Sequence, residues 1–575
     1  MKRSFLLGLL LLLTAVFVVP TFAATAVDAT RPVLVQAENV DTAAEIVNDF
    51  GGQVNEELAI INAVSADVLV ASVSAISDDP RTVAVYDDNM AEIAGRNNKR
   101  PSRSQFGAAF PEVMGADVAW EAGVTGDSVT VAVLDTGIAN QRWIRERIVE
   151  RYDALDNGPR KTDPHGHGTM MASLIGNDRT YRRLYVSVAP EVQFVDVRVL
   201  DSEGKGTYTD IVEGLNWVLE NKDELNIRVV NMSLMSAVNG PYWADPINQS
   251  VEALWEAGIV VVAAAGNGGS DPMTISAPGN DPFIITVGAF TDNYTPDDLS
   301  DDYIAPFSGA GPTEMGFIKP DIVAPGAHMA AKAPNNSIFA QENPDLNVRG
   351  NYYKIAGTSA ATAVTSGAIA LMLDANPDMT PDEVKYALMA SAQSAAYDDG
   401  QLVWSVFQQG AGRISLHESV LNPPEGEANV GMEPGGTYVG PVAYQTDDDG
   451  SNGKFVIVDE EGNPIADAEG YSWLGGYSWL GGYSWLGGYS WLGGYSWLGG
   501  YSWLGGYSWL GSVDDWQDWS TDAVWQSGYS WLGGYSWLGG YSWLGGYSWL
   551  GGYSWLGGYS WLGIAEFPEA TPPSP

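Results

Sequence analysis

Four polar residues stand where nucleophilic and acid–base chemistry would need them. Asp135 ends the apolar run Val131–Leu134, and His167, Asn267 and Ser359 follow it along the chain. An Asp at the end of a buried parallel strand lies at the carboxyl edge of the sheet, where α/β folds keep their sites. A Ser just before a helix has its hydroxyl and N–H at the positive end of the helix dipole.

Each residue alone also has a plainer interpretation. Asp135 could end a strand and cap a turn, Ser359 could be an ordinary N-cap, and Asn267 could be a turn residue after a glycine. His165 and His167 have the His-x-His spacing of a metal pair. Asp, His and Ser nevertheless occur in that order within one periodic region, with an Asn between His and Ser, which favours a catalytic set over four unrelated coincidences.

Alternating strands and helices over residues 105–422 would position this set. Mostly apolar runs predict strands buried on both faces, and one run that alternates apolar with charged residues, Phe194–Val199, predicts a strand with one face less buried. The buried runs are Val129–Leu134, Arg228–Met232 and Ile259–Ala265. Amphipathic stretches predict helices at Thr209–Glu220, Ile247–Ala257 and about 360–374, and Thr380-Pro-Asp-Glu383 predicts a capping box with Pro at the first helical position. The fold class is α/β, a doubly wound parallel sheet.

The N-terminus and the composition indicate the compartment. Lys2 and Arg3 precede an apolar run to Val19 and small residues to Ala26, so we predict a signal peptide over 1–26; an uncleaved membrane anchor is the alternative. The 575-residue chain has 28 Lys+Arg and 71 Asp+Glu, a net charge of −43, which argues against nucleic acid as a partner. It has no Cys, which excludes disulfides, thiolate zinc sites and a Cys nucleophile.

A small α+β unit is expected before the catalytic region. Residues 27–104 contain strand-like Pro32–Ala37, Leu58–Val64 and Thr82–Tyr86, and helix-like Thr42–Phe50 and Ala66–Ile76. This pattern predicts βαβαβ, or βαββαβ if one short strand escapes detection. A polar linker follows at 95–104.

The C-terminal third is repetitive. After a small β or linker region at 423–469, Gly-Tyr-Ser-Trp-Leu-Gly is repeated over 470–563, with a polar interruption at 512–527 and a tail at 564–575. Tyr-Ser-Trp-Leu favours strands and Gly-Gly favours two-residue turns, so a β-meander is one interpretation. A hexapeptide β-solenoid and a low-complexity tail without stable structure are the alternatives. Arrays of aromatic residues bind surfaces or self-associate.

The motifs together resemble the subtilisin-like serine peptidases, or subtilases. The family's D-T-G lies at Asp135, its H-G-T-x-x-A begins at His167, its G-T-S-x-A surrounds Ser359, and its G-N matches at Asn267. The resemblance covers about 106–422, and residues 27–95 are similar in position and element order to the family's inhibitory propeptide.

The resemblance implies a secreted endopeptidase that cuts protein or peptide substrates. Ser359 would be the nucleophile, His167 the general base, Asp135 its orienting partner and Asn267 an oxyanion donor. The family's substrate-binding positions fall on Gly204, Lys205, Gly206, Ser233, Leu234, Met235, Ala264, Ala265 and Gly266. The propeptide would act as an intramolecular inhibitor. No cofactor is expected for the chemistry, and structural Ca²⁺ is compatible with the family although no ligands are located.

Several residues depart from the family pattern. Met235-Ser236 replaces the Gly pair that often follows Ser-Leu, which would narrow the substrate cleft, and Ala360 replaces a frequent Met after the nucleophile. These departures leave a second hypothesis open, a surface-binding protein that keeps the scaffold without turnover. The intact set of four chemical residues favours the enzyme.

Overall fold

The computed structural model describes residues 29–94, 110–155, 158, 161–181, 184–269, 271–295, 301–395, 403–446, 453–458, 543–544 and 548–549. The predicted signal peptide, the linker at 95–104 and nearly all of the repeats lie outside these residues. Within the described ranges, no helix is long and apolar enough to cross a membrane.

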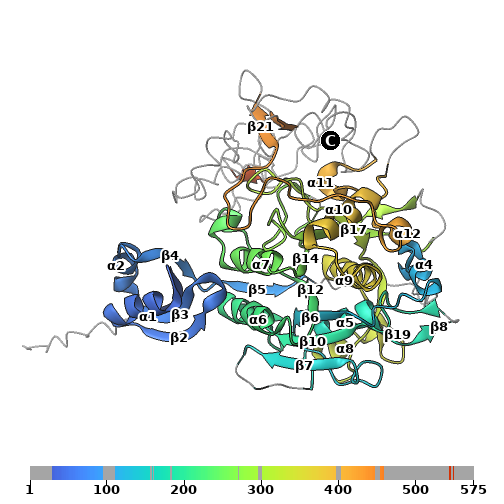
Figure 1. Ribbon diagram of the computed structural model, residues 1–575, viewed down its shortest axis with the longest axis horizontal. Coiled ribbons are helices and arrows are strands. Elements are labelled where there is room, and N and C mark those ends of the chain that lie inside the picture. The colour runs from blue at the N-terminus through green and yellow to red at the C-terminus, as the bar shows by residue number, and fades with distance from the viewer. Residues whose placement is uncertain are drawn as a thin grey trace, which may run out of the picture.

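A mainly parallel eight-stranded sheet forms the centre of the molecule (Figure 1), as predicted. Only β16 runs antiparallel to its neighbour, and β17 pairs with β15 beside the main path. The strands, in spatial order, are β16 (Tyr303–Ile304), β15 (Ile285–Thr291), β14 (Val260–Ala264), β12 (Ile227–Met232), β6 (Thr130–Asp135), β10 (Gln193–Arg198) and β7 (Ile148–Asp153), with β17 (Ile322–Pro325) paired to β15.

Helices cover the sheet on both faces. The buried helices α5 (His167–Gly176) and α9 (Thr358–Ala375) pack against each other, and α9 crosses β12, β14, β15 and β17. The amphipathic helices α6 (Tyr208–Asn221) and α7 (Pro246–Glu256) pack together and contact β6, β7 and β14. The expected helix after Thr380 is α10 (Pro381–Ser391), and it begins with the predicted capping box and Pro.

One strand prediction was wrong in its burial. We expected Phe194–Val199 to have a less buried face, yet in β10 both charged side chains, Asp196 and Arg198, are buried. Each is paired with an opposite charge on the neighbouring strand β7, Asp196 with Arg151 and Arg198 with Asp153. A buried charge is tolerated when it is paired in this way, and an alternating pattern alone cannot reveal the partner.

The N-terminal unit has the order βαββαβ. Its antiparallel sheet, β2-β3-β1-β4, packs α1 on a core of its own and places the opposite face against α6 and α7 of the body. The elements are β1 (Thr30–Ala37), α1 (Val40–Asp49), β2 (Gln53–Leu58), β3 (Ala63–Leu69), α2 (Val73–Ser77) and β4 (Thr82–Asp87).

Two boundaries in this unit were predicted wrongly. Leu58–Val64 is not a strand, because a 3₁₀ turn at Ala59–Ile61 separates β2 from β3. Ala66–Ile76 is not one helix, because β3 continues to Leu69 and only Val73–Ser77 is α-helical. The missed strand β2 is rich in polar residues, Gln53, Asn55, Glu56 and Glu57, so its sequence carries a weak strand signal.

A short strand leaves the N-terminal unit and enters the body (Figure 1). This strand, β5 (Met90–Ile93), lies antiparallel between β11 (Lys205–Thr207) and β13 (Leu234–Ser236). The other α-helices and strands described before residue 420 are α3 (Phe110–Met114), α4 (Ala116–Glu121), β8 (Thr180–Tyr181), β9 (Leu184–Tyr185), β18 (Met329–Lys332), α8 (Ile338–Glu342), β19 (Asn347–Arg349), β20 (Tyr352–Ile355), α11 (Val406–Gln409) and α12 (Leu416–Ser419).

Two hairpins follow toward the C-terminus. In the expected β or linker region, β21 (Val442–Thr446) pairs with β22 (Gly453–Ile457). Of the repeats, the structure describes β23 (Trp543–Leu544) and β24 (Ser548–Trp549), which pair antiparallel with Leu544 opposite Ser548. Three residues lie between Leu544 and Ser548 in the sequence. A two-residue Gly-Gly turn would instead place Leu544 opposite Tyr547, so the observed register is not the one expected for such a turn.

Candidate active site

An aspartate and a histidine meet where β6 ends and α5 begins. His167 Nδ1 lies 2.8 Å and 2.9 Å from the two carboxylate oxygens of Asp135. Both side chains are buried, and the N–H of Thr136 donates to Asp135 Oδ1 over 2.7 Å. Within the described residues, His167 Nε2 has no hydrogen-bond partner. The pair is therefore an oriented imidazole with one nitrogen available for chemistry.

A second buried carboxylate, Asp163, holds this geometry together. It accepts hydrogen bonds from Thr136 Oγ1 (2.9 Å), from the Gly166 N–H (2.7 Å), and from the N–H and Oγ1 of Thr169 (2.9 and 2.7 Å). The N-cap residue Gly166 has no side chain to cap α5, so Asp163 performs that task from three residues earlier.

Sequence reasoning missed Asp163. An acidic residue just ahead of a helix start is a capping signal that could have found it. Burial raises the pKa of Asp163, against the hydrogen bonds that lower it. Burial also lowers the pKa of the neighbouring His165, and the proximity of His167 lowers it further.

Ser359 lies in the first turn of α9, two residues deeper than expected, because the helix begins at Thr358 rather than at Ala360. Gly357 is the N-cap, so the ordinary N-cap interpretation of Ser359 does not hold. Its hydroxyl donates to the Ser233 carbonyl over 3.2 Å, and Ser233 Oγ donates to the Ser359 carbonyl over 3.0 Å. Asn231 links this pair to Ser366, which lies about two turns further along α9. Its Nδ2 donates to Ser233 Oγ, and its Oδ1 accepts from Ser366 Oγ, both over 2.9 Å.

Two donors converge on a peptide carbonyl beside Ser359. The side-chain amide of Asn267 and the N–H of Ser359 (3.3 Å) both donate to the carbonyl oxygen of Ala94. Asn267 Oδ1 accepts from the N–H and Oγ1 of Thr358, at 3.0 and 3.1 Å, which turns the amide nitrogen toward that carbonyl. Sequence reasoning had no signal for Ala94.

The predicted substrate-binding segments flank the strand that ends at Ala94. Ile93 donates to the Gly204 carbonyl over 3.0 Å, and Ala94 donates to the Ser233 carbonyl over 3.1 Å. Lys205 and Gly206 pair with Glu92 and Ala91 from one side, and Leu234 and Met235 pair with Ile93 and Glu92 from the other.

The third predicted segment lies at the end of β14. Ala264 is the last residue of that strand, and Ala265 accepts a hydrogen bond from the Ser276 N–H over 3.0 Å. Gly266 has φ +100°, and a side chain there would collide with Ser276 Oγ. A glycine is therefore required immediately before Asn267.

The metal-pair alternative has little geometric support. The centroids of the His165 and His167 imidazole rings lie 6.2 Å apart, and His167 Nδ1 is hydrogen-bonded to Asp135. Across the part of the chain that the structure describes, no three His, Asp or Glu side chains are grouped to hold a metal ion.

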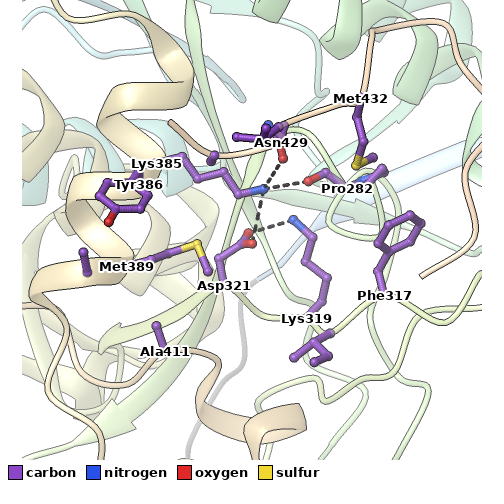
Figure 2. A pocket seen from close by; sticks show the side chains of 14 residues that line it. Pro282, Phe317, Lys319, Asp321, Lys385, Tyr386, Met389, Ala411, Asn429 and Met432 are labelled. Carbon is purple, nitrogen blue, oxygen red and sulfur yellow. Dashed lines mark hydrogen bonds and ion pairs between the residues drawn. The ribbon is translucent and has the colours of Figure 1, made fainter. Parts of the chain in front are cut away.

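A hollow of about 560 Å³ lies elsewhere, between α10 and the segments 317–321 and 428–432. Figure 2 shows the ammonium groups of Lys319 and Lys385 converging on Asp321, at 2.7 and 3.3 Å. Lys385 also donates to the Pro282 carbonyl over 2.6 Å, and Lys319 to the Ile284 carbonyl over 2.9 Å. The charged groups of this hollow are therefore hydrogen-bonded to one another and to main-chain carbonyls, which is typical of a structural ion cluster.

Comparisons with known proteins agree with the geometry. Residues 126–412 match the Subtilase family. Serine protease AprX of Bacillus subtilis (strain 168) is 38% identical over 304 residues, 52% of this chain and 67% of AprX. The extracellular serine proteinase of Thermus sp. (strain Rt41A) is 31% identical over 332 residues, 58% of this chain and 71% of the relative.

A solved structure has the same fold. The crystal structure of fervidolysin from Fervidobacterium pennivorans, a keratinolytic enzyme related to subtilisin, superposes with a TM-score of 0.57 at 21% identity, covering 75% of this chain and 67% of fervidolysin.

Proposed function

Because the chain belongs to the subtilase family of serine peptidases, we propose that it is a secreted endopeptidase whose catalytic residues are Ser359, His167 and Asp135. The observation that carries this proposal is the Ala94 carbonyl, which accepts hydrogen bonds from Asn267 and the Ser359 N–H as a scissile carbonyl would. Secretion is supported by the signal-like N-terminus and by the relative named as extracellular.

The proposed mechanism proceeds through an ester. Ser359 Oγ turns from the Ser233 carbonyl, attacks the carbonyl carbon and passes its proton to His167 Nε2. Asn267 and the Ser359 N–H stabilise the oxyanion. The C–N bond then breaks as His167 protonates the leaving amine. Water, deprotonated by His167, hydrolyses the acyl-enzyme, and Asp135 stabilises the imidazolium in both halves. Structural calcium remains a prediction without located ligands.

The N-terminal unit is proposed to be an intramolecular inhibitor that the enzyme removes itself. Its strand β5 occupies the cleft between β11 and β13, and its sheet packs on α6 and α7. Since Ala94 contributes the carbonyl at the two donors, the bond proposed to be cut is Ala94–Gly95. After the cut, β5 would stay bound between β11 and β13 and block the cleft, because it uses the main-chain pairing by which a substrate would bind.

Mass analysis of the purified protein tests both proposals. We expect a new N-terminus at Gly95 in the full-length chain, and an uncut chain in Ser359→Ala expressed alone. A fluorophosphonate probe, which reacts only with an activated Ser, should label the first protein and not the second. Processing of Ser359→Ala to the same end would refute self-cleavage, and failure of the wild-type protein to label would favour the non-enzymatic scaffold.

A second proposal concerns the repeats, as a separate surface-binding or self-associating module. Thirteen copies supply 13 Tyr and 13 Trp without a charge, and the described dipeptides Trp543–Leu544 and Ser548–Trp549 pair as strands. A short two-sided ribbon of this kind needs a surface to pack against. Truncation after Ala468 should leave peptide hydrolysis unchanged and reduce sedimentation of assemblies; unchanged association would refute the proposal.

A further inference from the structure

The segment bound in the cleft also indicates which substrates fit. Resting on the proposed function, we propose that Met235 restricts cleavage to peptides with a small residue just before the cut bond. The residue in that position here is Ala94, whose side chain is fully buried. Three observations place Met235 at the boundary of its compartment.

The first observation is the register of the bound strand. Side chains alternate along an extended segment, so Ala94 and Glu92 project to the same face. Met235 lies directly opposite Glu92 in the β13–β5 pairing. Residues directly opposite each other in a pair share a face, so the thioether of Met235 lies on the face to which Ala94 projects.

The second observation is a contact that crosses this face. Ser276 Oγ donates to Met235 Sδ over 3.9 Å. Ser276 is itself fixed beneath the turn at Ala265–Asn267, through its N–H bond to the Ala265 carbonyl and its tight approach to Gly266. The Met235–Ser276 bridge therefore runs from one wall of the cleft, β13, to the other wall, which bears the amide of Asn267.

The third observation is a hollow on the far side of the bridge. A space of about 520 Å³ is lined by Met90, Glu92, Lys205, Met235, Ser236 and Ser276, together with two alanines, Ala91 and Ala237, and Ala94 does not line it. Met235 and Ser276 both line this space and Ala94 does not, so the proposal assigns their bridge as the partition between the compartment of Ala94 and the volume beside Glu92. Removing the Met235 side chain would join the two spaces.

Kinetics on a peptide series test the proposal. The series varies only the residue before the cut bond, Ala against Phe, in wild-type enzyme, Met235→Gly and the volume-matched control Met235→Leu. A single methylene in an apolar pocket changes kcat/KM by about 10–200-fold, so wild type should favour Ala over Phe by at least tenfold. Met235→Gly should raise kcat/KM for Phe by at least tenfold, whereas Met235→Leu, which keeps the side-chain volume, should retain the wild-type ratio of kcat/KM for Ala over Phe.

Each outcome decides something separate. Wild-type enzyme that labels with fluorophosphonate and cuts the Phe peptide as fast as the Ala peptide would overturn this inference and leave the proposed function standing. No labelling and no cleavage of either peptide would overturn the proposed function. If Met235→Gly fails to fold, Ser276→Ala removes the bridge from the other wall and should raise cleavage of the Phe peptide; no rise would count against the proposal.

Self-processing gives an independent measurement. In the full chain, Ala94→Phe should stall cleavage at the following bond, and adding Met235→Gly should restore it, since the larger side chain then enters the joined space. Cleavage of the single variant at the wild-type rate would contradict the inference. Mass analysis of the N-terminus reports the outcome directly.

Discussion

Asp135 and Asp321 are both buried carboxylates with basic partners, but the partners of the two groups differ in whether they keep a free hydrogen-bonding position. Asp135 binds His167 Nδ1, while the second imidazole nitrogen has no partner within the described residues. Asp321 binds Lys319, Lys385 and the Thr286 N–H, and both ammonium groups also bind main-chain carbonyls. The first arrangement leaves one imidazole nitrogen without a hydrogen-bond partner, whereas in the second both ammonium groups and both carboxylate oxygens have partners.

This difference in free hydrogen-bonding positions indicates which carboxylate serves catalysis and which one stabilises the fold. A buried ion cluster whose members satisfy each other stabilises one packing arrangement and has no group left to exchange protons with a substrate. An imidazole that is held at one nitrogen and free at the other is suited to proton transfer. Burial and ion pairing alone therefore do not distinguish a functional site from a structural one. An open position does not do so either, since Asp196 Oδ1 and Arg198 Nε also lack partners within the described residues; the open group must in addition be one suited to proton transfer, as an imidazole nitrogen is.

Of the substitutions that test this comparison, removal of His167 should have the largest effect, and the effect should be on turnover. His167→Ala should lower turnover by about 10⁶-fold, since residues of a triad act as a unit. For the same reason the double variant with Ser359→Ala should be no slower than either single variant. Residual turnover, corrected for background hydrolysis, is the measurement, and multiplying losses in the double variant would contradict a shared function.

Removing Lys385 should affect stability instead. Lys385→Met leaves Asp321 with one ammonium partner fewer and strips two main-chain carbonyls of a donor, and breaking a buried pair costs about 3–5 kcal/mol. Urea unfolding should show that loss, with kcat per labelled Ser359 unchanged. Lys222→Met, at a more exposed ion pair with Asp223, is the matched control and should change stability by less than about 1 kcal/mol.

Removing Asn267, the proposed oxyanion donor, should have a smaller effect on catalysis than removing His167. Asn267→Ala should lower kcat by about 10²–10³-fold with little change in KM, because the amide acts on charge that develops in the transition state. Active-site titration corrects for unprocessed enzyme. A large rise in KM at unchanged kcat would instead assign Asn267 to ground-state binding.

Glu314, a third buried carboxyl, extends the comparison because its protonation should make the stability of the protein depend on pH. Glu314 accepts from two neutral donors, the Tyr242 N–H and Asn280 Nδ2, and burial raises its pKa from 4.5 to about 8. The folded state therefore holds this proton more tightly than the unfolded chain, and the resulting stability is lost as pH rises from 4.5 toward 8.

Glu314→Gln should remove that dependence. Relative to wild type, it should gain up to about 1.4 kcal/mol of unfolding free energy per pH unit within this window. Urea titrations at pH 5, 6 and 7 measure the difference, with the exposed Glu342→Gln as control. A constant difference between wild type and Glu314→Gln across those pH values would show that Glu314 titrates normally.

Much of the catalytic region was predictable because its signals are local. The runs that became β6, β12 and β14 are apolar over the length of a strand, and Thr380 and Glu383 form their capping box within one turn of helix. Asp135, His167, Asn267 and Ser359 could be proposed from the sequence because each lies in a short motif at the end of an element, where a sheet gathers its polar side chains.

What only the tertiary structure decided involves residues far apart in the chain. Ala94 and Asn267 are 173 positions apart, Asp196 meets Arg151 across 45, and Met235 meets Ser276 across 41. Periodicity reports how a residue relates to its own strand or helix, and it does not report which distant side chain fills the remaining space or satisfies a buried charge. The sequence by itself therefore determined the α/β fold with its mainly parallel sheet, and it indicated the residues that we propose for the chemistry. Packing determined which main-chain carbonyl meets the amide of Asn267 and the N–H of Ser359, and which side chain Met235 contacts, because both depend on contacts that form only when separate elements meet.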